Sequence, residues 1–128
     1  MQTTRPTQVF IVDDSPWIRE RLAQALAPLP GVTLVGEAAC AADAVAGILR
    51  TRPDSVVLDL NLMGRSGLDV MRAICPEIPG IAFVVLTNHS ESQYRDACLK
   101  AGARYFLDKS EEFERVPGVI AEIAASLH

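Results

Sequence analysis

Cysteine is scarce in this sequence. The 128 residues include three, Cys40, Cys75 and Cys98, an odd number with no C-x-x-C spacing. This pattern argues against a disulfide framework and against a zinc site. Each cysteine lies among apolar or helix-patterned residues, so we interpret all three as small buried side chains in a reducing compartment. We therefore expect the protein to be cytoplasmic.

Long hydrophobic runs are absent as well. The longest, Ile81–Leu86, has six residues, whereas a membrane-spanning helix needs about 20. The first run, Val9–Val12, has four residues and is too short for the apolar core of a signal peptide. The sequence therefore predicts neither a membrane span nor a secretion signal.

An excess of basic charge is missing too. There are 12 Lys and Arg residues against 16 Asp and Glu residues, and the net charge is −4. An acidic chain is poorly suited to bind a phosphate backbone, so direct nucleic-acid binding is not expected. With 49% hydrophobic and 22% charged residues, the composition is that of a folded globular protein. A chain of this length holds one core, so we expect a single domain over residues 1–128, without an effector domain.

The motifs of several enzyme classes are not found either. The sequence has no P-loop, no G-x-G-x-x-G and no G-x-S-x-G, which argues against a nucleotide-binding loop and a serine-hydrolase nucleophile. The two histidines, His89 and His128, have no partner at metal-ligand spacing. Any site chemistry must therefore come from carboxylates, hydroxyls and lysines.

Short apolar runs alternate with helix-length amphipathic segments along the whole chain. Near-continuous apolar strands are expected where helices cover both faces of a sheet, so the pattern predicts a doubly wound α/β fold of five βα units. The predicted strands are Gln8–Asp13, Val32–Val35, Ser55–Leu60, Ile81–Leu86 and Tyr105–Leu107.

Capping residues predict where the helices begin. Ser15-Pro16 combines a favourable N-cap with proline at the first helical position. Capping-box patterns open two further helices at Ser66 and Ser90. In the second of these helices the spacing places Tyr94 on the buried face. The remaining helices are expected at about 41–51, after the second strand, and from near Pro117, after an irregular first turn.

Polar residues collect at the carboxyl ends of the predicted strands. They are Asp13 and Asp14 at the end of the first strand, Asp59 near the end of the third, Thr87 at the end of the fourth and Lys109 at the end of the fifth. In a doubly wound sheet, ligands bind beyond these strand ends. Each residue alone has an ordinary explanation, such as helix capping, a turn or a solvated charge. Their joint placement on four strands is what favours a site.

Three carboxylates brought together repel one another, and a hard divalent cation with oxygen ligands relieves that repulsion. Mg²⁺ fits this description. A carboxylate beside Mg²⁺ can attack phosphorus and form an aspartyl phosphate, while a lysine and a hydroxyl bind the phosphoryl oxygens. The five residues supply every group that this chemistry needs.

These segments resemble the response regulator receiver domain of bacterial two-component signalling, over almost the whole chain. The matching segments are Val9–Ser15, Val56–Asn61, Gly64–Gly67, Val84–Thr87 and Lys100–Lys109. The resemblance implies a flavodoxin-like (βα)₅ sandwich with a parallel sheet of strand order 2-1-3-4-5. It also implies a Mg²⁺-dependent phosphoacceptor site. Asp59 matches the phosphoacceptor, and Asp13 and Asp14 match the acidic pair that binds Mg²⁺ together with Asp59 and the backbone carbonyl of Asn61.

The same resemblance implies a switch. Thr87 matches the hydroxyl residue that closes onto the phosphoryl group, and Lys109 matches the lysine that pairs with it. Phe106 matches the aromatic switch residue that follows the threonine. Asn61 and His89, two residues after Asp59 and Thr87, match positions at which family members tune the rate of dephosphorylation.

Three positions depart from the family pattern. Met63 stands where a proline is usual, although the neighbouring Gly64 is kept. Asn88 replaces a small residue and is expected to narrow access to Asp59. Ser110 replaces a proline that often forms a cis bond after the lysine. None of these removes a group that the chemistry needs.

The resulting expectation is a phosphorylation switch, not an enzyme beyond assisting its own phosphorylation and dephosphorylation. Its expected partners are a sensor histidine kinase or phosphotransfer protein, and a downstream protein or second copy that binds the fourth helix, fifth strand and fifth helix. A receiver-like docking module that is never phosphorylated is one alternative. A phosphohydrolase working through an aspartyl phosphate is another. It is disfavoured because Asn61 stands where such enzymes have an acid.

Overall fold

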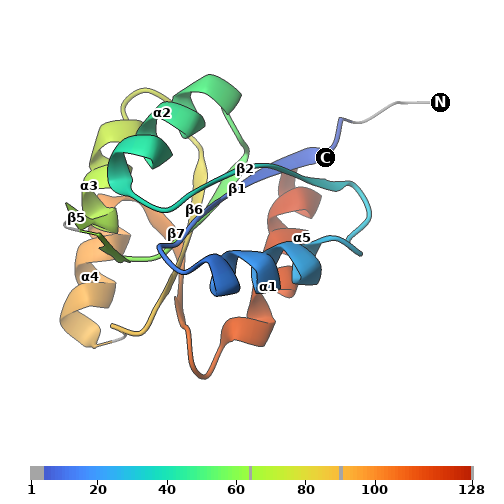
Figure 1. Ribbon diagram of the computed structural model, residues 1–128. Helices are drawn as coiled ribbons and strands as arrows, with labels where there is room; N and C mark the ends of the chain where they lie inside the picture. The colour runs from blue at the N-terminus through green and yellow to red at the C-terminus, as the bar shows by residue number, and fades with distance from the viewer. Residues whose placement is uncertain (1–4, 64, 90, 128) are drawn as a thin grey trace.

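A five-stranded parallel sheet forms the centre of the protein (Figure 1). The structure, a computed structural model, describes residues 5–63, 65–89 and 91–127. The strands of the sheet are β1 (Thr7–Val12), β2 (Val32–Ala38), β3 (Ser55–Leu58), β6 (Ala82–Thr87) and β7 (Ala103–Asp108). Their spatial order, β2-β1-β3-β6-β7, confirms the predicted doubly wound fold and its 2-1-3-4-5 topology.

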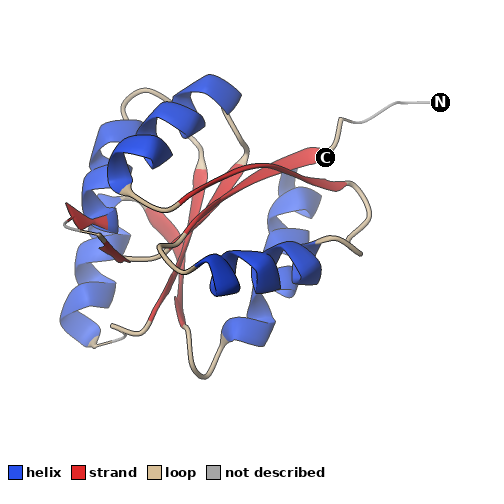
Figure 2. Cartoon of the chain, viewed as in Figure 1, coloured by secondary structure: helices blue, strands red, loops and turns tan. Residues whose placement is uncertain are grey.

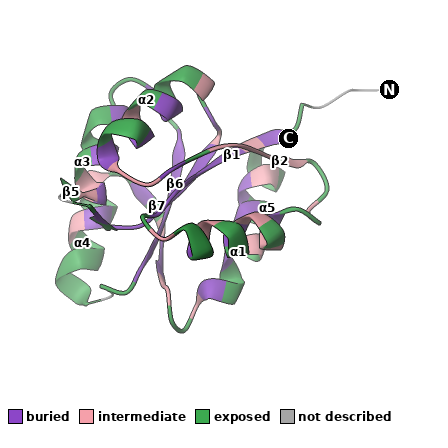
Figure 3. Cartoon of the chain, viewed as in Figure 1, coloured by how far each residue is buried: buried purple, intermediate pink, exposed green. Residues whose placement is uncertain are grey.

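Helices cover both faces of this sheet, as Figure 2 shows. The helices are α1 (Pro16–Leu26), α2 (Ala41–Thr51), α3 (Gly67–Ile74), α4 (Ser92–Ala101) and α5 (Val116–Leu127). Alternate strand residues serve the two faces, because successive side chains of a strand point in opposite directions. On β1, Phe10 and Val12 pack with α2, α3 and α4, whereas Val9 and Ile11 pack with α1 and α5. The inner strands β1, β3 and β6 are therefore buried on both sides, whereas the edge strand β2 is mostly half-buried or exposed (Figure 3).

Two predicted helix caps are present. The Ser15 side chain accepts a hydrogen bond from the backbone N–H of Ile18 at 3.3 Å, and Pro16 is the first residue of α1. Ser66 caps α3 by accepting from the N–H of Leu68 at 3.1 Å. A 3₁₀ turn, η1 (Phe113–Arg115), precedes α5, as the prediction of an irregular turn before Pro117 implied. No helix in the described part of the chain is both long and apolar enough to cross a membrane.

The segment after β3 differs from the prediction. The strand ends at Leu58 rather than Leu60, and a short antiparallel hairpin follows, formed by β4 (Asn61–Leu62) and β5 (Arg65–Ser66). A glycine-containing loop was expected there. The N–H of Asp59 still donates to the carbonyl of Val12, after which the chain leaves the sheet and its backbone groups pair within the hairpin.

The start of α4 also differs. Glu91 is its N-cap residue, without a side-chain cap bond, and Ser90 lies outside the described residues. The prediction that Tyr94 is buried is wrong, because its side chain is 39% exposed. On this helix only Cys98 is fully buried. α4 covers the edge strand β7, so its first turns have little sheet beneath them.

Candidate functional site

The strand ends bring the predicted site residues together. Asp13 follows β1 and Asp59 follows β3, and both are almost fully buried, with 1% and 5% of their surface exposed. Thr87, the last residue of β6, is fully buried. Lys109 follows β7, and its N–H donates to the carbonyl of Thr87 at 2.8 Å. Buried polar side chains need hydrogen-bond partners, and Asp13 and Asp59 find theirs in Lys109.

Lys109 links two of the carboxylates. Its Nζ lies 2.8 Å from Asp13 Oδ2 and 2.8 Å from Asp59 Oδ2. Burial alone would lower the pKa of Lys109, but its hydrogen bonds to Asp13 and Asp59 and their negative charges outweigh burial and raise the pKa above 10.5. The ammonium therefore stays protonated at neutral pH and offsets part of the negative charge of the site.

The surroundings of Asp13 disfavour the ionised form of its carboxyl group. Burial is the main cause that raises the pKa of its carboxyl group, and the charge of Asp59 raises it further, against the opposing hydrogen bonds from Lys109 and the Ser15 N–H. The N–H of Ser15 donates to Asp13 Oδ1 at 2.9 Å. The Arg19 side chain, on α1, donates to the backbone carbonyl of Asp13 at 2.6 Å and so links the end of β1 to α1. The repulsion expected between clustered carboxylates is thus present at Asp13.

The acidic group has the arrangement of a cation site. One carboxylate oxygen each from Asp13, Asp14 and Asp59 lies within 4.8 Å of the others. Asp14 is exposed whereas the other two are buried, so the group opens to solvent on one side. Three carboxylate oxygens with access for water are a ligand set that suits a hard divalent cation. The N–H of Asn61 donates to Asp59 Oδ1 at 3.2 Å, and the metal-binding role predicted for its carbonyl stays a prediction.

The two predicted switch residues lie on neighbouring strands. Thr87 Oγ1 accepts a hydrogen bond from the N–H of His89 at 3.1 Å. Phe106, on β7, is buried at 6% exposure on the face covered by α4. The Arg95 guanidinium carbon, on α4, lies 5.9 Å from the centre of the Phe106 ring. Phe106 thus packs in the same core cluster as Cys98 of α4 and lies near the Arg95 guanidinium of that helix.

A glycine packs closely against the backbone that follows β3. A β-carbon at Gly67 would lie 2.4 Å from the carbonyl oxygen of Asp59 and 3.1 Å from the α-carbon of Leu60. The N–H of Gly67 also donates to the carbonyl of Leu60 at 2.8 Å. Sequence reasoning included Gly67 in a matching segment but gave it no role. One feature of the sequence could have pointed to this role: Gly67 directly follows the N-cap serine. Glycine is a poor helix former, so a glycine at the start of a helix suggests that a tertiary contact requires it.

The three departures from the family pattern lie at the rim of the site. Met63 is 67% exposed at the β4–β5 hairpin, and its neighbour Gly64 lies outside the described residues. Asn88 is exposed, and its Oδ1 accepts from the Ser110 hydroxyl at 3.4 Å. Two of the unusual residues thus contact each other. All peptide bonds of the described residues are trans, the bond before Ser110 included.

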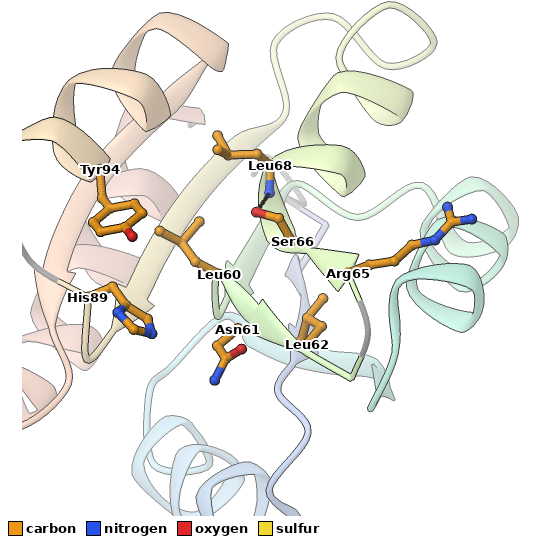
Figure 4. A pocket seen from close by; sticks show the side chains of 8 residues that line it. All are labelled: Leu60, Asn61, Leu62, Arg65, Ser66, Leu68, His89 and Tyr94. Carbon is orange, nitrogen blue, oxygen red and sulfur yellow. Dashed lines mark hydrogen bonds between the residues drawn. The ribbon is translucent and has the colours of Figure 1, made fainter.

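A pocket of about 410 Å³ opens where Leu60 and Asn61 follow Asp59 in the chain (Figure 4). It lies between the β4–β5 hairpin and the start of α4, and is lined by Leu60, Asn61, Leu62, Arg65, Ser66, Leu68, His89 and Tyr94. The His89 and Tyr94 rings are in contact, with centres 5.5 Å apart and planes tilted by 52°. The pocket includes both residues predicted to tune the rate, Asn61 and His89.

A second group of aromatic contacts joins α1 to the turn before α5. Trp17, in the first turn of α1, is 64% exposed. The guanidinium carbon of Arg21 lies 5.0 Å from the centre of the Trp17 ring and 4.1 Å from that of Phe113. A guanidinium over an aromatic face is attractive, so Arg21 connects α1 to the turn before α5.

Comparison with known proteins identifies the family of this fold and site. The model of the response regulator receiver domain matches residues 9–121. The chain belongs to this family. Response regulator UvrY of Escherichia coli (strain K12) is 30% identical over 115 residues, which are 90% of this chain and 53% of UvrY. The nitrate/nitrite response regulator protein NarP of the same strain is 36% identical over 114 residues, or 89% of this chain and 53% of NarP. The chain thus spans about half the length of these curated relatives.

Solved receiver structures superpose closely on this receiver domain. The signal receiver domain of the response regulator NarL from Mycobacterium tuberculosis has a TM-score of 0.86 at 27% identity, covering 95% of this chain and 98% of that one. A LuxR-family two-component response regulator from Aurantimonas sp. SI85-9A1 has a TM-score of 0.84 at 31% identity, covering 94% and 86%. The fold is therefore that of receivers in bacterial response regulators.

Proposed function

We propose that this receiver domain is a phosphorylation-activated switch of a two-component phosphorelay, with Asp59 as the phosphoacceptor. The observation that supports it is the pair of bonds from Lys109 to Asp13 and Asp59 within a group of three carboxylates. A lysine and a cation site around one buried carboxylate provide positive charge where phosphoryl oxygens would lie. The proposed donor is a phosphohistidine of a sensor histidine kinase or a phosphotransfer protein.

The proposed transfer is a substitution at phosphorus. A carboxylate oxygen of Asp59 forms the new P–O bond while the P–N bond to the donor histidine breaks, and the bonding electron pair leaves with the imidazole. Asp13, Asp14, Asp59 and the carbonyl of Asn61 are proposed to bind Mg²⁺. When bound, the metal supplies positive charge to the phosphoryl oxygens. Lys109 then pairs with a phosphoryl oxygen in place of the Asp59 oxygen that it contacts in the unphosphorylated chain.

Thr87 and Phe106 are proposed to transmit the change. The Thr87 hydroxyl accepts from His89, so its own hydrogen is available for a phosphoryl oxygen. As Thr87 moves toward the phosphoryl group, Phe106 fills the space it leaves. Because Arg95 contacts the Phe106 ring, a turn of that ring changes the packing between β7 and α4. Two discrete arrangements of this kind are how packed switches operate.

The output surface is proposed to consist of α4, β7 and α5. Arg95 and Arg104 are exposed there, and Tyr105 is half-buried, with its hydroxyl 3.4 Å from Glu122 of α5. A mixed basic and aromatic surface suits a protein partner, either a downstream protein or a second copy of the domain. We propose that this acidic domain does not itself bind nucleic acid, and that it is a cytoplasmic switch rather than an enzyme.

Phosphorylation with a small-molecule donor tests the proposal. The chain is incubated with acetyl phosphate and Mg²⁺, and its intact mass is measured. One phosphoryl group is expected on the wild type and on Asp69→Asn, an exposed aspartate of α3, and none on Asp59→Asn or with EDTA. Labelling of Asp59→Asn, or labelling that EDTA leaves unchanged, would contradict the proposal. Phosphate release without any detectable phosphorylated chain would indicate the phosphohydrolase, and neither label nor phosphate release from the wild type would indicate the docking module.

A further inference from the structure

Tyr94 is an aromatic residue that lies outside the buried core. It is 39% exposed, on a helix whose fully buried residue is Cys98. Its ring instead contacts that of His89, with ring centres 5.5 Å apart, and the two rings together line one side of the pocket next to Leu60 and Asn61 (Figure 4). Tilted aromatic pairs at this separation attract each other. The contact joins α4 to the loop that follows Thr87.

His89 has few other constraints on its side chain. Its backbone N–H is bonded to Thr87 Oγ1 at 3.1 Å, but among residues 5–63, 65–89 and 91–127 the imidazole makes no hydrogen bond. An exposed side chain without partners samples several rotamers. Packing against Tyr94 favours the rotamer in which the imidazole extends toward the part of the pocket that Asn61 lines (Figure 4).

This pocket borders the phosphoacceptor. Leu60 and Asn61, the two residues after Asp59, form part of its wall, and Arg65 and Tyr94 lie on other walls. Water that attacks an aspartyl phosphate must approach along a path left open by these side chains. The position of the imidazole would therefore change how much of that path is open, and the ring of Tyr94 is in contact with the imidazole.

We propose that Tyr94 is a positioning residue, which holds the His89 imidazole in the pocket beside Asp59 and so sets the lifetime of the aspartyl phosphate. The lifetime part rests on the proposed function of Asp59. Tyr94 acts through its ring, because the contact with His89 is between rings and the phenol hydroxyl makes no hydrogen bond within the described chain. Phenylalanine should therefore replace it.

The test measures the half-life of the phosphorylated domain after the donor is removed. Tyr94→Leu should change the half-life at least twofold, in the same direction as His89→Ala. Tyr94→Phe should match the wild type, and so should Leu99→Ala, which removes another exposed side chain from α4. In the His89→Ala background, Tyr94→Leu should have no further effect. An unchanged half-life in Tyr94→Leu, an additive double variant, or an equal change in Leu99→Ala would each overturn the proposal.

A second measurement does not depend on phosphorylation. The imidazole protons of His89, assigned with His89→Ala because the chain has two histidines, should show a ring-current shift in NMR spectra. Tyr94→Leu should abolish that shift and Tyr94→Phe should keep it. Unchanged imidazole shifts in Tyr94→Leu would show that Tyr94 does not position His89, whatever happens at Asp59. A wild type that takes no phosphoryl group would instead contradict the proposed function, and the lifetime role with it.

Discussion

The carbonyl oxygen of Asp59 and the α-carbon of Gly67 are so close that a β-carbon on Gly67 would stand 2.4 Å from that oxygen. The atoms that a β-carbon would meet are backbone atoms of Asp59 and Leu60. Unlike the end of a flexible side chain, they cannot move away by a change of rotamer. The first turn of α3 thus packs directly against the backbone of Asp59, the proposed phosphoacceptor.

Gly67→Ala is therefore expected to destabilise the fold by about 1–3 kcal/mol, as overpacking against rigid neighbours does. It should also slow labelling of Asp59, because the loop must shift. Gly118→Ala is the matched control: a β-carbon there meets no atom within 4 Å, and helix propensity favours alanine by up to about 1 kcal/mol. Urea unfolding measures both. Equal effects of the two substitutions would contradict the role of the close contact.

Divalent metal is expected to stabilise the domain. A cation that binds the folded state alone adds about 1.4 kcal/mol at roughly ten times its Kd, so thermal melts should shift upward with millimolar Mg²⁺. Asp14→Ala should abolish the shift with little effect on the metal-free melt, because Asp14 is the exposed member of the acidic group. Equal shifts in the wild type and in Asp14→Ala would indicate a nonspecific ion effect.

The raised pKa of Lys109 predicts how the free energy of unfolding changes at alkaline pH. Its pKa is raised above 10.5, so the folded chain binds this proton more tightly than the unfolded chain does. The resulting stabilisation is fully present below pH 10.5 and is lost as the pH rises through the folded-state pKa. Urea unfolding from pH 8 upward should show a steeper alkaline loss in the wild type than in Lys109→Met. Lys100→Met, on α4, should keep the wild-type slope; a wild-type slope in Lys109→Met would refute the assignment.

Asn61 and His89 should control the lifetime of the aspartyl phosphate. Both line the pocket beside Asp59. The hydrogen bond from Asn61 to Asp59 comes from the backbone, so a change of its side chain leaves the carboxylate in place. Asn61→Ala and His89→Ala are each expected to change the half-life several-fold with unaltered circular dichroism. Met63→Ala, at the exposed hairpin, serves as the control, and half-lives within error of the wild type for both variants would count against this prediction.

Phosphorylation should alter the surface around Phe106. Beryllofluoride with Mg²⁺ serves as the phosphoryl mimic, and amide hydrogen exchange or NMR shifts are followed along the chain. Changes are expected in residues 91–110, because Arg95 contacts the Phe106 ring, and Phe106→Ala should suppress those in α4. Changes confined to the metal-binding loops, with residues 91–110 silent, would mean that the switch does not propagate through this aromatic residue.

The sequence predicted the sheet and the grouping of Asp13, Asp59 and Lys109, because apolar runs and strand-end polar residues are local patterns with one consistent arrangement. It missed the β4–β5 hairpin, because two-residue strands have no periodicity to detect. It placed Tyr94 inward because helical spacing cannot show how far the sheet extends beneath a helix. The need for Gly67 is a tertiary contact, and no local pattern reveals it.

The exposed side chain of Trp17 has a practical consequence. It is the only tryptophan in the sequence, and it lies in the first turn of α1, next to the acidic residues and beneath the guanidinium of Arg21. Indole emission depends on nearby charge and solvent, so the fluorescence of this chain reports on this one location. We therefore expect Mg²⁺ binding and phosphorylation, if they occur at the acidic residues as proposed, to change the Trp17 emission of the unmodified protein, without an attached dye.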